Sequence, residues 1–225
     1  MIEGFLEKLA EYMSKRYGMK YFFKKCAAAK PPVQSLDGKE RTPEWEVEGN
    51  LPCLLGYSDG EVFIISTILY ELEDILSDAI WDWFDKTILG FREMNHKARH
   101  EMLRREKEEV ARKLTDRNTW GELKQKYGYV VAWLDYHDEV ARQVTEKTGV
   151  KIVHRFNPES VNILGYFYAQ FNWSGMSSEE KMKMVEKALD AIDMACREAG
   201  HPPNSEARRK FHEKFEEFRR QKGYI

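Results

Sequence analysis

The positions of greatest chemical interest in this 225-residue chain lie on one predicted hairpin, LPCLLGYSDGEVFIISTI, from residue 51 to residue 68. Two apolar runs flank a Ser-Asp-Gly turn, a pattern typical of paired strands. Carboxylates on such a hairpin could hold Mg²⁺, which activates water and stabilises charge at phosphorus. The residues here are unsuited to that chemistry. Cys53 is a poor Mg²⁺ ligand, the Ser66 hydroxyl coordinates weakly, and Ile68 cannot stabilise charge.

Hydrophobic periodicity predicts the elements around this hairpin. Helices are expected over residues 2–17, 68–89, 92–114, 119–128, 177–200 and 205–223. Strands are expected over residues 19–25, 45–55 and 61–67. The last of these is apolar on both faces, which indicates a central strand. Gly18 and Gly90 are placed to end helices, and Pro31-Pro32 and Asp37-Gly38 predict a loop.

The stretch YVVAWLDYHDEVARQVTEKTGVKIV reads as a strand–helix–strand unit. Tyr129–Leu134 is apolar and partly β-branched, which favours a strand. Asp135 is placed to cap the helix that follows, and Gly149 is placed to end it. Val150–Val153 reads as the second strand, parallel to the first, because a βαβ crossover joins parallel neighbours.

The order of a first helix, a hairpin, further helices and this unit resembles the PD-(D/E)XK nuclease-like superfamily, which includes archaeal Holliday-junction resolvases and many restriction-type endonucleases. Asp135 and Gly149-Val150-Lys151-Ile152-Val153 match its closing unit, and Pro52 takes the place of its proline. The resemblance covers about residues 1–156, with a helical insertion at about 91–126. It implies an α/β fold: a small mixed sheet of restriction-endonuclease-like topology, an inserted charged helical hairpin, and a mainly helical C-terminal extension over 157–225.

The same resemblance places the family's catalytic aspartate, glutamate and lysine at Cys53, Ser66 and Ile68. We therefore expect the usual nuclease activity to be absent. Carboxylates at other positions could restore a Mg²⁺ site, and the first helix carries an acidic ligand in some members of the family. The candidates are Glu11, Glu48, Asp59 and Glu61. Unless they do so, no metal and no other cofactor is expected.

A net charge of −2 hides an uneven distribution along the chain. Residues 37–90 hold 13 acidic and 3 basic side chains, whereas residues 91–126 hold 11 basic and 7 acidic ones. Nucleic acid would favour the basic stretch, because phosphate contact is mainly electrostatic. The candidate contacts are Lys97, Arg99, Arg104, Arg105, Arg112 and Lys113. Interleaved glutamates favour the alternative of i,i+4 ion pairs on an exposed or coiled-coil helix.

Four other patterns are incomplete or have unsuitable residues. Residues 119–137 are similar to a helix-turn-helix, but its second helix would present acidic residues to the major groove. The pairs Glu93-x-x-His96 and His96-x-x-Arg99 match fragments of di-iron and recombinase motifs, and His137-Asp138 matches a fragment of a phosphohydrolase motif. The sequence contains no Gly-rich phosphate loop and no recognisable serine or cysteine nucleophile.

The composition limits the classes of protein to which this chain could belong. Hydrophobic residues make up 42% of the chain, enough for a core, and no apolar run approaches the ~20 residues that span a membrane. The N-terminus lacks the pattern of a secretion signal. Three cysteines without CxxC spacing argue against a disulfide framework or a zinc site and favour the cytoplasm. The Lys/Glu-rich balance is compatible with a heat-adapted protein.

These observations predict a cytoplasmic, catalytically degenerate relative of nucleases, retained for nucleic-acid binding or for assembly. Two alternatives stay open. One is an active, metal-dependent DNA nuclease with relocated acidic ligands. The other is an oligomeric protein-interaction module without nucleic acid. The expected partners are nucleic acid or further copies of the chain, with no membrane and no small-molecule cofactor.

Overall fold

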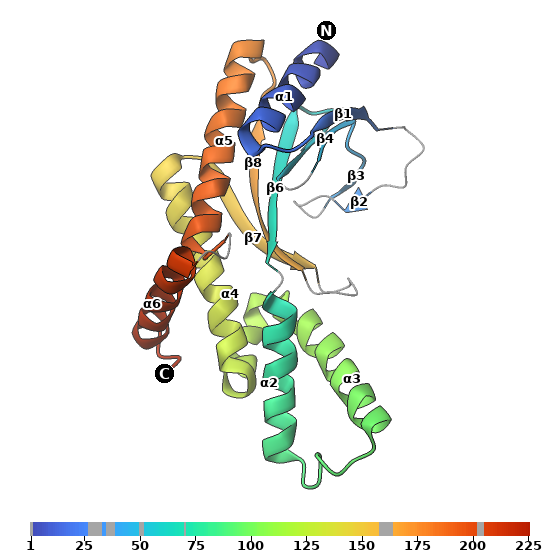
Figure 1. The fold of residues 1–225 in the computed structure, drawn as a ribbon, viewed down its shortest axis with the longest axis vertical. Helices are drawn as coiled ribbons and strands as arrows, with labels where there is room; N and C mark the ends of the chain where they lie inside the picture. Colours follow the sequence, from blue (N-terminus) through green and yellow to red (C-terminus); the bar gives the residue numbers. More distant parts are fainter. Residues whose placement is uncertain are drawn as a thin grey trace. The chain divides into compact units, whose positions relative to one another are not determined.

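The computed structural model describes residues 2–26, 33–34, 39–49, 52–69, 71–157, 164–201 and 205–225. The chain has a mixed α/β fold in which runs of strands are separated by runs of helices (Figure 1). The helices are α1 (Ile2–Tyr17), α2 (Glu71–Thr87), α3 (His96–Leu114), the 3₁₀ turn η1 (Arg117–Thr119), α4 (Trp120–Thr148), α5 (Ser178–Glu198) and α6 (Ser205–Gln221). The strands are β1 (Phe22–Lys25), β2 (Val33–Gln34), β3 (Glu40–Arg41), β4 (Trp45–Glu48), β5 (Cys53–Gly56), β6 (Glu61–Leu69), β7 (Lys151–Asn157) and β8 (Leu164–Asn172).

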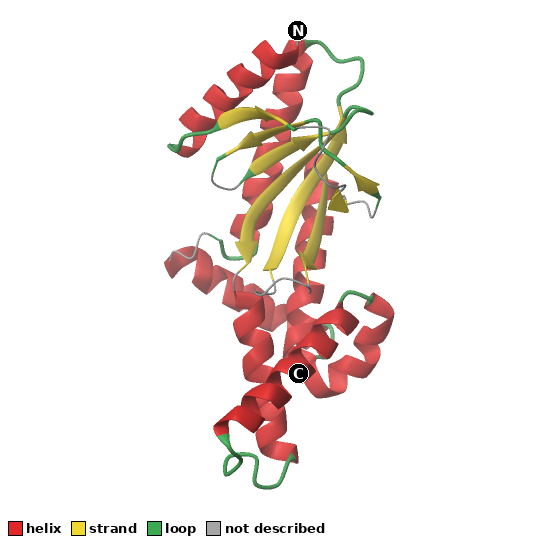
Figure 2. Ribbon diagram, turned by 90° about the vertical axis from the view of Figure 1, so that its right-hand side faces the viewer, coloured by secondary structure: helices red, strands yellow, loops and turns green. Residues whose placement is uncertain are grey.

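Six strands form one antiparallel sheet in the order β1-β4-β5-β6-β8-β7, and β2 pairs with β3 separately. Figure 2 shows this sheet with helices behind it. Within the hairpin, Cys53 lies opposite Ile65 and Gly56 lies opposite Val62. Strand β6 is central, as its sequence predicts, and Val62, Phe63 and Ile64 are all fully buried.

The chain divides into two compact units. The first unit comprises Met1–Thr67, Ala141–Val153 and Phe167–Pro202. The second unit comprises Ile68–Val140, His154–Tyr166 and Pro203–Ile225.

The first unit has an aromatic core between α1 and the sheet. The Trp45 and Trp173 rings stack with centroids 5.1 Å apart, and Phe5 of α1 meets Trp173 edge-on at 5.7 Å. At the other end of α1, the Arg16 guanidinium donates to Asp190 at 2.7 Å and to Asp193 at 2.6 Å. Helices α1 and α5 are therefore fixed to each other by ion pairs.

The second unit has its own core, built from α6 and the first part of α4. Phe211 and Phe215 of α6 pack edge-on against Trp133 and Tyr136 of α4, with centroids 4.9–5.6 Å apart. Tyr224 donates a hydrogen bond to Asp135 at 3.0 Å beside this cluster. Helices α2 and α3 form a hairpin. Phe91, in the turn between them, packs edge-on against Trp81 and Phe84 of α2.

The expected strand at Tyr129–Leu134 is wrong, because these residues belong to the 29-residue helix α4. Asp135 is inside that helix rather than at its start. The βαβ unit inferred from this stretch is therefore absent, and the sheet is antiparallel instead of mixed. Strand β7 covers the expected Val150–Val153, but its neighbour is β8.

Several local predictions are confirmed. Helix α1 has the expected bounds, and Gly18, Gly90 and Gly149 follow helices with the positive φ angles that favour glycine. The Ser177 cap of α5 forms a capping box with Glu180. The expected short helix at 119–128 is merged into α4, with non-helical backbone at Tyr127. Most of the predicted loop around Pro31-Pro32 and Asp37-Gly38 lies outside the described residues.

Candidate functional site

The hairpin β5–β6 does not bring its three motif positions together. Since Cys53 pairs with Ile65 and side chains alternate along a strand, Cys53 and Ser66 point to opposite faces of the sheet. The side chain of Ile68 lies outside what the structure describes. Even with carboxylates at positions 53 and 66, the hairpin could not hold one ion between them.

The surroundings of Cys53 and of Ser66 suit a structural role for each residue. Burial, followed by the charges of Glu46 and Glu48, raises the pKa of the Cys53 thiol to about 11, so it is not a reactive thiolate at neutral pH. Ser66 is fully buried, and its hydroxyl accepts a hydrogen bond from the Phe167 backbone N–H at 2.8 Å. Ser66 thus links β6 to β8, a role that a charged glutamate could fill only at a high desolvation cost.

Three of the candidate carboxylates, on β4 and on the hairpin, are held by separate local partners. Glu48 pairs with Lys24 of β1 at 3.4 Å, and Asp59 pairs with Arg41 of β3. Glu61 accepts weak hydrogen bonds of 3.3–3.4 Å from Asn172 and Gln170 of β8. These three carboxylates therefore do not converge on a common point.

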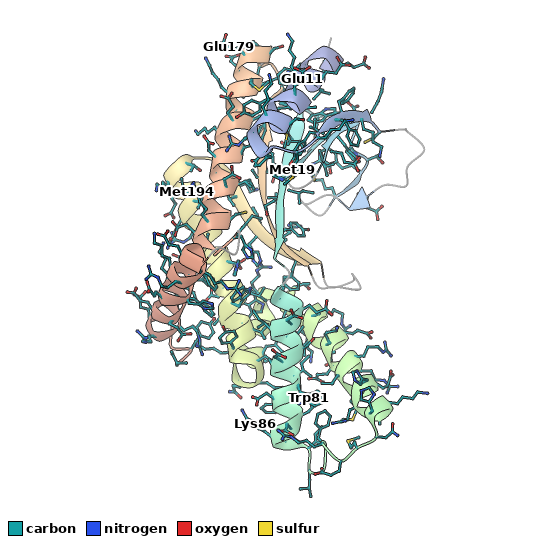
Figure 3. All side chains as sticks on the ribbon, viewed as in Figure 1. Glu11, Met19, Trp81, Lys86, Glu179 and Met194 are labelled. Carbon is teal, nitrogen blue, oxygen red and sulfur yellow. The ribbon has the colours of Figure 1, made fainter. Side chains whose placement is uncertain are left out.

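Glu11 lies on the exposed side of α1 (Figure 3). It lines a shallow cavity of about 390 Å³ together with residues of α1 and the start of β1. None of the other three candidate carboxylates lines that cavity. Within the described ranges, no group of three or more His, Cys, Asp or Glu side chains is arranged to hold a metal ion.

The basic residues of α3 are largely paired along their own helix. Arg104 bonds to Glu101 and Glu108, and Arg105 also bonds to Glu101. These contacts lower the pKa of Glu101 to about 2. Lys113 pairs with Glu109, and Arg99 stacks over the ring of Trp81 of α2 at 5.4 Å. For Lys97 and Arg112 the structure shows no ion pair within the described segments. These contacts include the i,i+4 pairs that the interleaved glutamates predict.

A groove of about 860 Å³ lies between α2 and α3, in the second unit. Ile80, Trp81 and Leu103 form its apolar part. Figure 3 shows Trp81 on α2, and 36% of this side chain remains exposed. The edge of the groove is charged: Asp78 lies on the α2 wall, and Lys97 and Arg105 lie on the α3 wall.

Sequence reasoning missed this groove. The apolar stripe of α2, which includes Leu76, Ile80 and Phe84, accounts for the buried face of the helix. Trp81 lies one position beside that stripe, among acidic residues. The signal for the groove in the sequence is a large aromatic residue on an otherwise charged helix face. Such a residue indicates a surface that another molecule could cover.

A partly buried cluster of Arg117, Asp138 and His154 links η1, α4 and β7 within the second unit. His154, with 1% of its side chain exposed, donates from Nδ1 to Asp138 at 3.0 Å. Arg117 donates to both oxygens of the same carboxylate at 3.0–3.2 Å. Burial of Asp138 raises its pKa, but the bonds from His154 and Arg117 outweigh burial and leave the pKa below its ordinary value.

This cluster predicts a pH-dependent contribution to stability. A carboxylate with a depressed pKa in the folded state stabilises the fold above its unfolded pKa of about 3.9, and the contribution is lost as pH falls through the folded value. We expect Asp138→Asn to lower the free energy of unfolding by about 1.5–3 kcal/mol at pH 7, and by less at pH 3. Urea unfolding at both pH values measures this.

The control is Glu146→Gln on the same helix, where the carboxylate is 63% exposed and pairs with Arg142 one turn earlier. That variant should change stability by less than about 0.5 kcal/mol at either pH. An Asp138→Asn penalty of equal size at pH 3 and pH 7 would contradict the assignment of the effect to the carboxylate charge.

Comparison of the chain with protein-family models, with curated proteins and with solved structures gave no match. In the described part of the chain, no helix is both long enough and apolar enough to cross a bilayer.

Proposed function

We propose that this chain is a non-enzymatic assembly module, and that the α2–α3 hairpin docks against the same hairpin of a second copy. The observation that supports this proposal is the groove between α2 and α3. It combines an exposed tryptophan with apolar neighbours and a charged rim, the composition typical of the centre and edge of a protein–protein interface.

The charges on the groove favour a second copy as the occupant. Asp78 on the α2 wall and Lys97 on the α3 wall are both exposed, and the structure shows neither in an ion pair within the described residues. A two-fold axis would bring the acidic wall of one copy to the basic wall of the other. In such an isologous contact both copies use the same surface patch. The pair between Asp78 of one copy and Lys97 of the other therefore forms twice.

The test is the mass of the particle in solution, measured by light scattering across concentrations up to ~100 μM, where an interface of modest affinity is populated. We expect a mass of twice 26.6 kDa for the natural chain. Trp81→Ala should shift the chain to the monomer, because central aromatic anchors commonly contribute ≥ ~2 kcal/mol. A strictly monomeric natural chain would contradict the proposal.

A charge exchange separates docking from a general loss of structure. Lys97→Asp and Asp78→Lys should each weaken the dimer, because each places like charges across the interface. The double variant Asp78→Lys/Lys97→Asp should regain it. As a control, Lys86→Asp alters a labelled surface residue of α2 that pairs with Asp82 and lies outside the groove, and should leave the dimer intact.

Nucleic-acid binding and metal-dependent cleavage stay predictions. A DNA-binding titration at two salt concentrations tests the first, because phosphate contacts weaken steeply with salt. Cleavage assays with Mg²⁺ on the natural chain and on Glu61→Ala test the second. The pairing of Arg104, Arg105 and Lys113 with glutamates, and the separation of the hairpin carboxylates, lead us to expect neither activity.

A further inference from the structure

We propose that His96 and His100 form a two-ligand site for a divalent transition-metal ion at the start of α3, with Cu²⁺ bound more tightly than Ni²⁺ or Zn²⁺. Both ligands come from one chain, and His100 also lines the α2–α3 groove. The site is distinct from the carboxylate positions considered on the hairpin.

Helix geometry places the two imidazoles together. Helix α3 begins at His96, after Asn95 has capped it by accepting from the Lys97 N–H. Residues at i and i+4 lie on one face of a helix, one turn apart. The two rings accordingly lie with centroids 4.2 Å apart, and both side chains are exposed.

The distance between the two ring nitrogens is suited to chelation. His96 Nε2 and His100 Nε2 are 2.9 Å apart. A metal with ~2.0–2.1 Å bonds to two imidazoles at right angles needs its nitrogens ~2.9 Å apart. The side chains already have this spacing, so an ion can bind without a large rotation of either ring, and the entropy cost of ordering the ligands is small.

A change of tautomer lets the neutral pair of imidazoles bind an ion. In the metal-free pair, one neutral imidazole donates its Nε2–H to the lone pair of the other. When an ion binds, that hydrogen moves to Nδ1 of the same ring, and both Nε2 lone pairs face the metal. Each ring stays neutral, and exchange of the hydrogen with solvent achieves the change of tautomer.

The surroundings determine which ions can bind. The described residues supply no third His, Cys, Asp or Glu ligand here, so water completes the coordination. Lys97 and the positive end of the α3 dipole disfavour cations held by charge alone. Mg²⁺ and Ca²⁺ prefer oxygen ligands and should not bind. Imidazole nitrogens instead favour Cu²⁺ and Ni²⁺, and the general order of affinities puts Cu²⁺ first.

The experiment is a calorimetric titration of the full-length chain, without an affinity tag, with Cu²⁺, Ni²⁺, Zn²⁺ and Mg²⁺. We expect one Cu²⁺ per chain, weaker binding of Ni²⁺ and Zn²⁺, and no heat of binding for Mg²⁺. His96→Ala and His100→Ala should each reduce Cu²⁺ affinity by at least about 10-fold, since losing even a residue that only orients a ligand costs about 10–100-fold.

The matched control is His212→Ala, which removes a single exposed histidine from α6. It should leave Cu²⁺ affinity unchanged. Electron paramagnetic resonance of the Cu²⁺ complex should show coupling to two nitrogens in the natural chain and to one in His100→Gln. The proposal is overturned if no ion saturates the chain, or if His96→Ala and His100→Ala bind Cu²⁺ as tightly as the natural chain does. Both histidines are exposed, so circular dichroism should confirm that the variants fold.

Discussion

Replacing Phe215 by alanine is expected to lower the free energy of unfolding by about 3–5 kcal/mol, the usual cost of removing a large buried aromatic side chain. Phe215 is fully buried on α6. It stacks on Phe211 with centroids 5.6 Å apart and meets Tyr129, Trp133 and Tyr136 of α4 edge-on. Truncation leaves a cavity among rigid rings, which cannot collapse to fill it.

Urea unfolding followed by circular dichroism measures this loss, and amide hydrogen exchange locates it. Exchange should accelerate in α6 and the first part of α4, because the packing between them is weakened. Phe22→Ala is the control, since Phe22 lies on the edge strand β1 with 48% of its surface exposed. If the two variants lost equal stability, α6 would not be packed as described.

Gly56→Ala is expected to be the most damaging single-methyl change in the first unit. The added methyl would overlap the indole ring of Trp45, which lies directly over Gly56 across the β4–β5 pair. Trp45 cannot move away, because it is 95% buried and stacks on Trp173. Overpacking of this kind costs about 1–3 kcal/mol and occasionally more, and we expect the upper end.

Gly4→Ala provides the matched comparison. Gly4 lies in α1, and nothing lies within 4 Å of the position that its methyl would occupy. Because alanine favours helices more than glycine does, this variant should be as stable as the natural chain or slightly more stable. Both variants are compared by thermal unfolding followed by circular dichroism. An unchanged melting temperature for Gly56→Ala would refute the described packing.

The sequence allowed prediction of those elements whose signals are local. Helix α5 has a capping box at its start and an apolar stripe along its length, and both features depend only on neighbouring residues. The same applies to α1, which ends where Gly18 adopts a positive φ. The β5–β6 hairpin follows from two apolar runs around a tight turn.

The stretch from Tyr129 to Leu134 could not be assigned from local signals. Val130, Val131, Ala132, Trp133 and Leu134 are all at most 2% exposed, so no polar face remains to reveal a helical period. A short apolar run with β-branched residues is then ambiguous between strand and helix. Tertiary packing of α4 against α6 overrides the weak strand preference of the two valines.

The candidate site was harder to predict than the fold. That Cys53 and Ser66 point to opposite faces depends on the pairing register, which the residue types alone do not reveal. The groove depends on how α2 and α3 lie against each other. The contact between His96 and His100, in contrast, depends only on helical spacing, so the i,i+4 pair of histidines in the sequence is its signal.

The position of β8 also has a consequence during synthesis of the protein. Strand β8 lies between β6 and β7, and the Ser66–Phe167 hydrogen bond spans 101 residues of sequence. A ribosome adding ~5–20 residues per second needs about 5–20 s to make that intervening chain. Throughout that interval the apolar strand β6 has an unpaired edge, which is the kind of surface on which nascent chains associate wrongly and which chaperones protect.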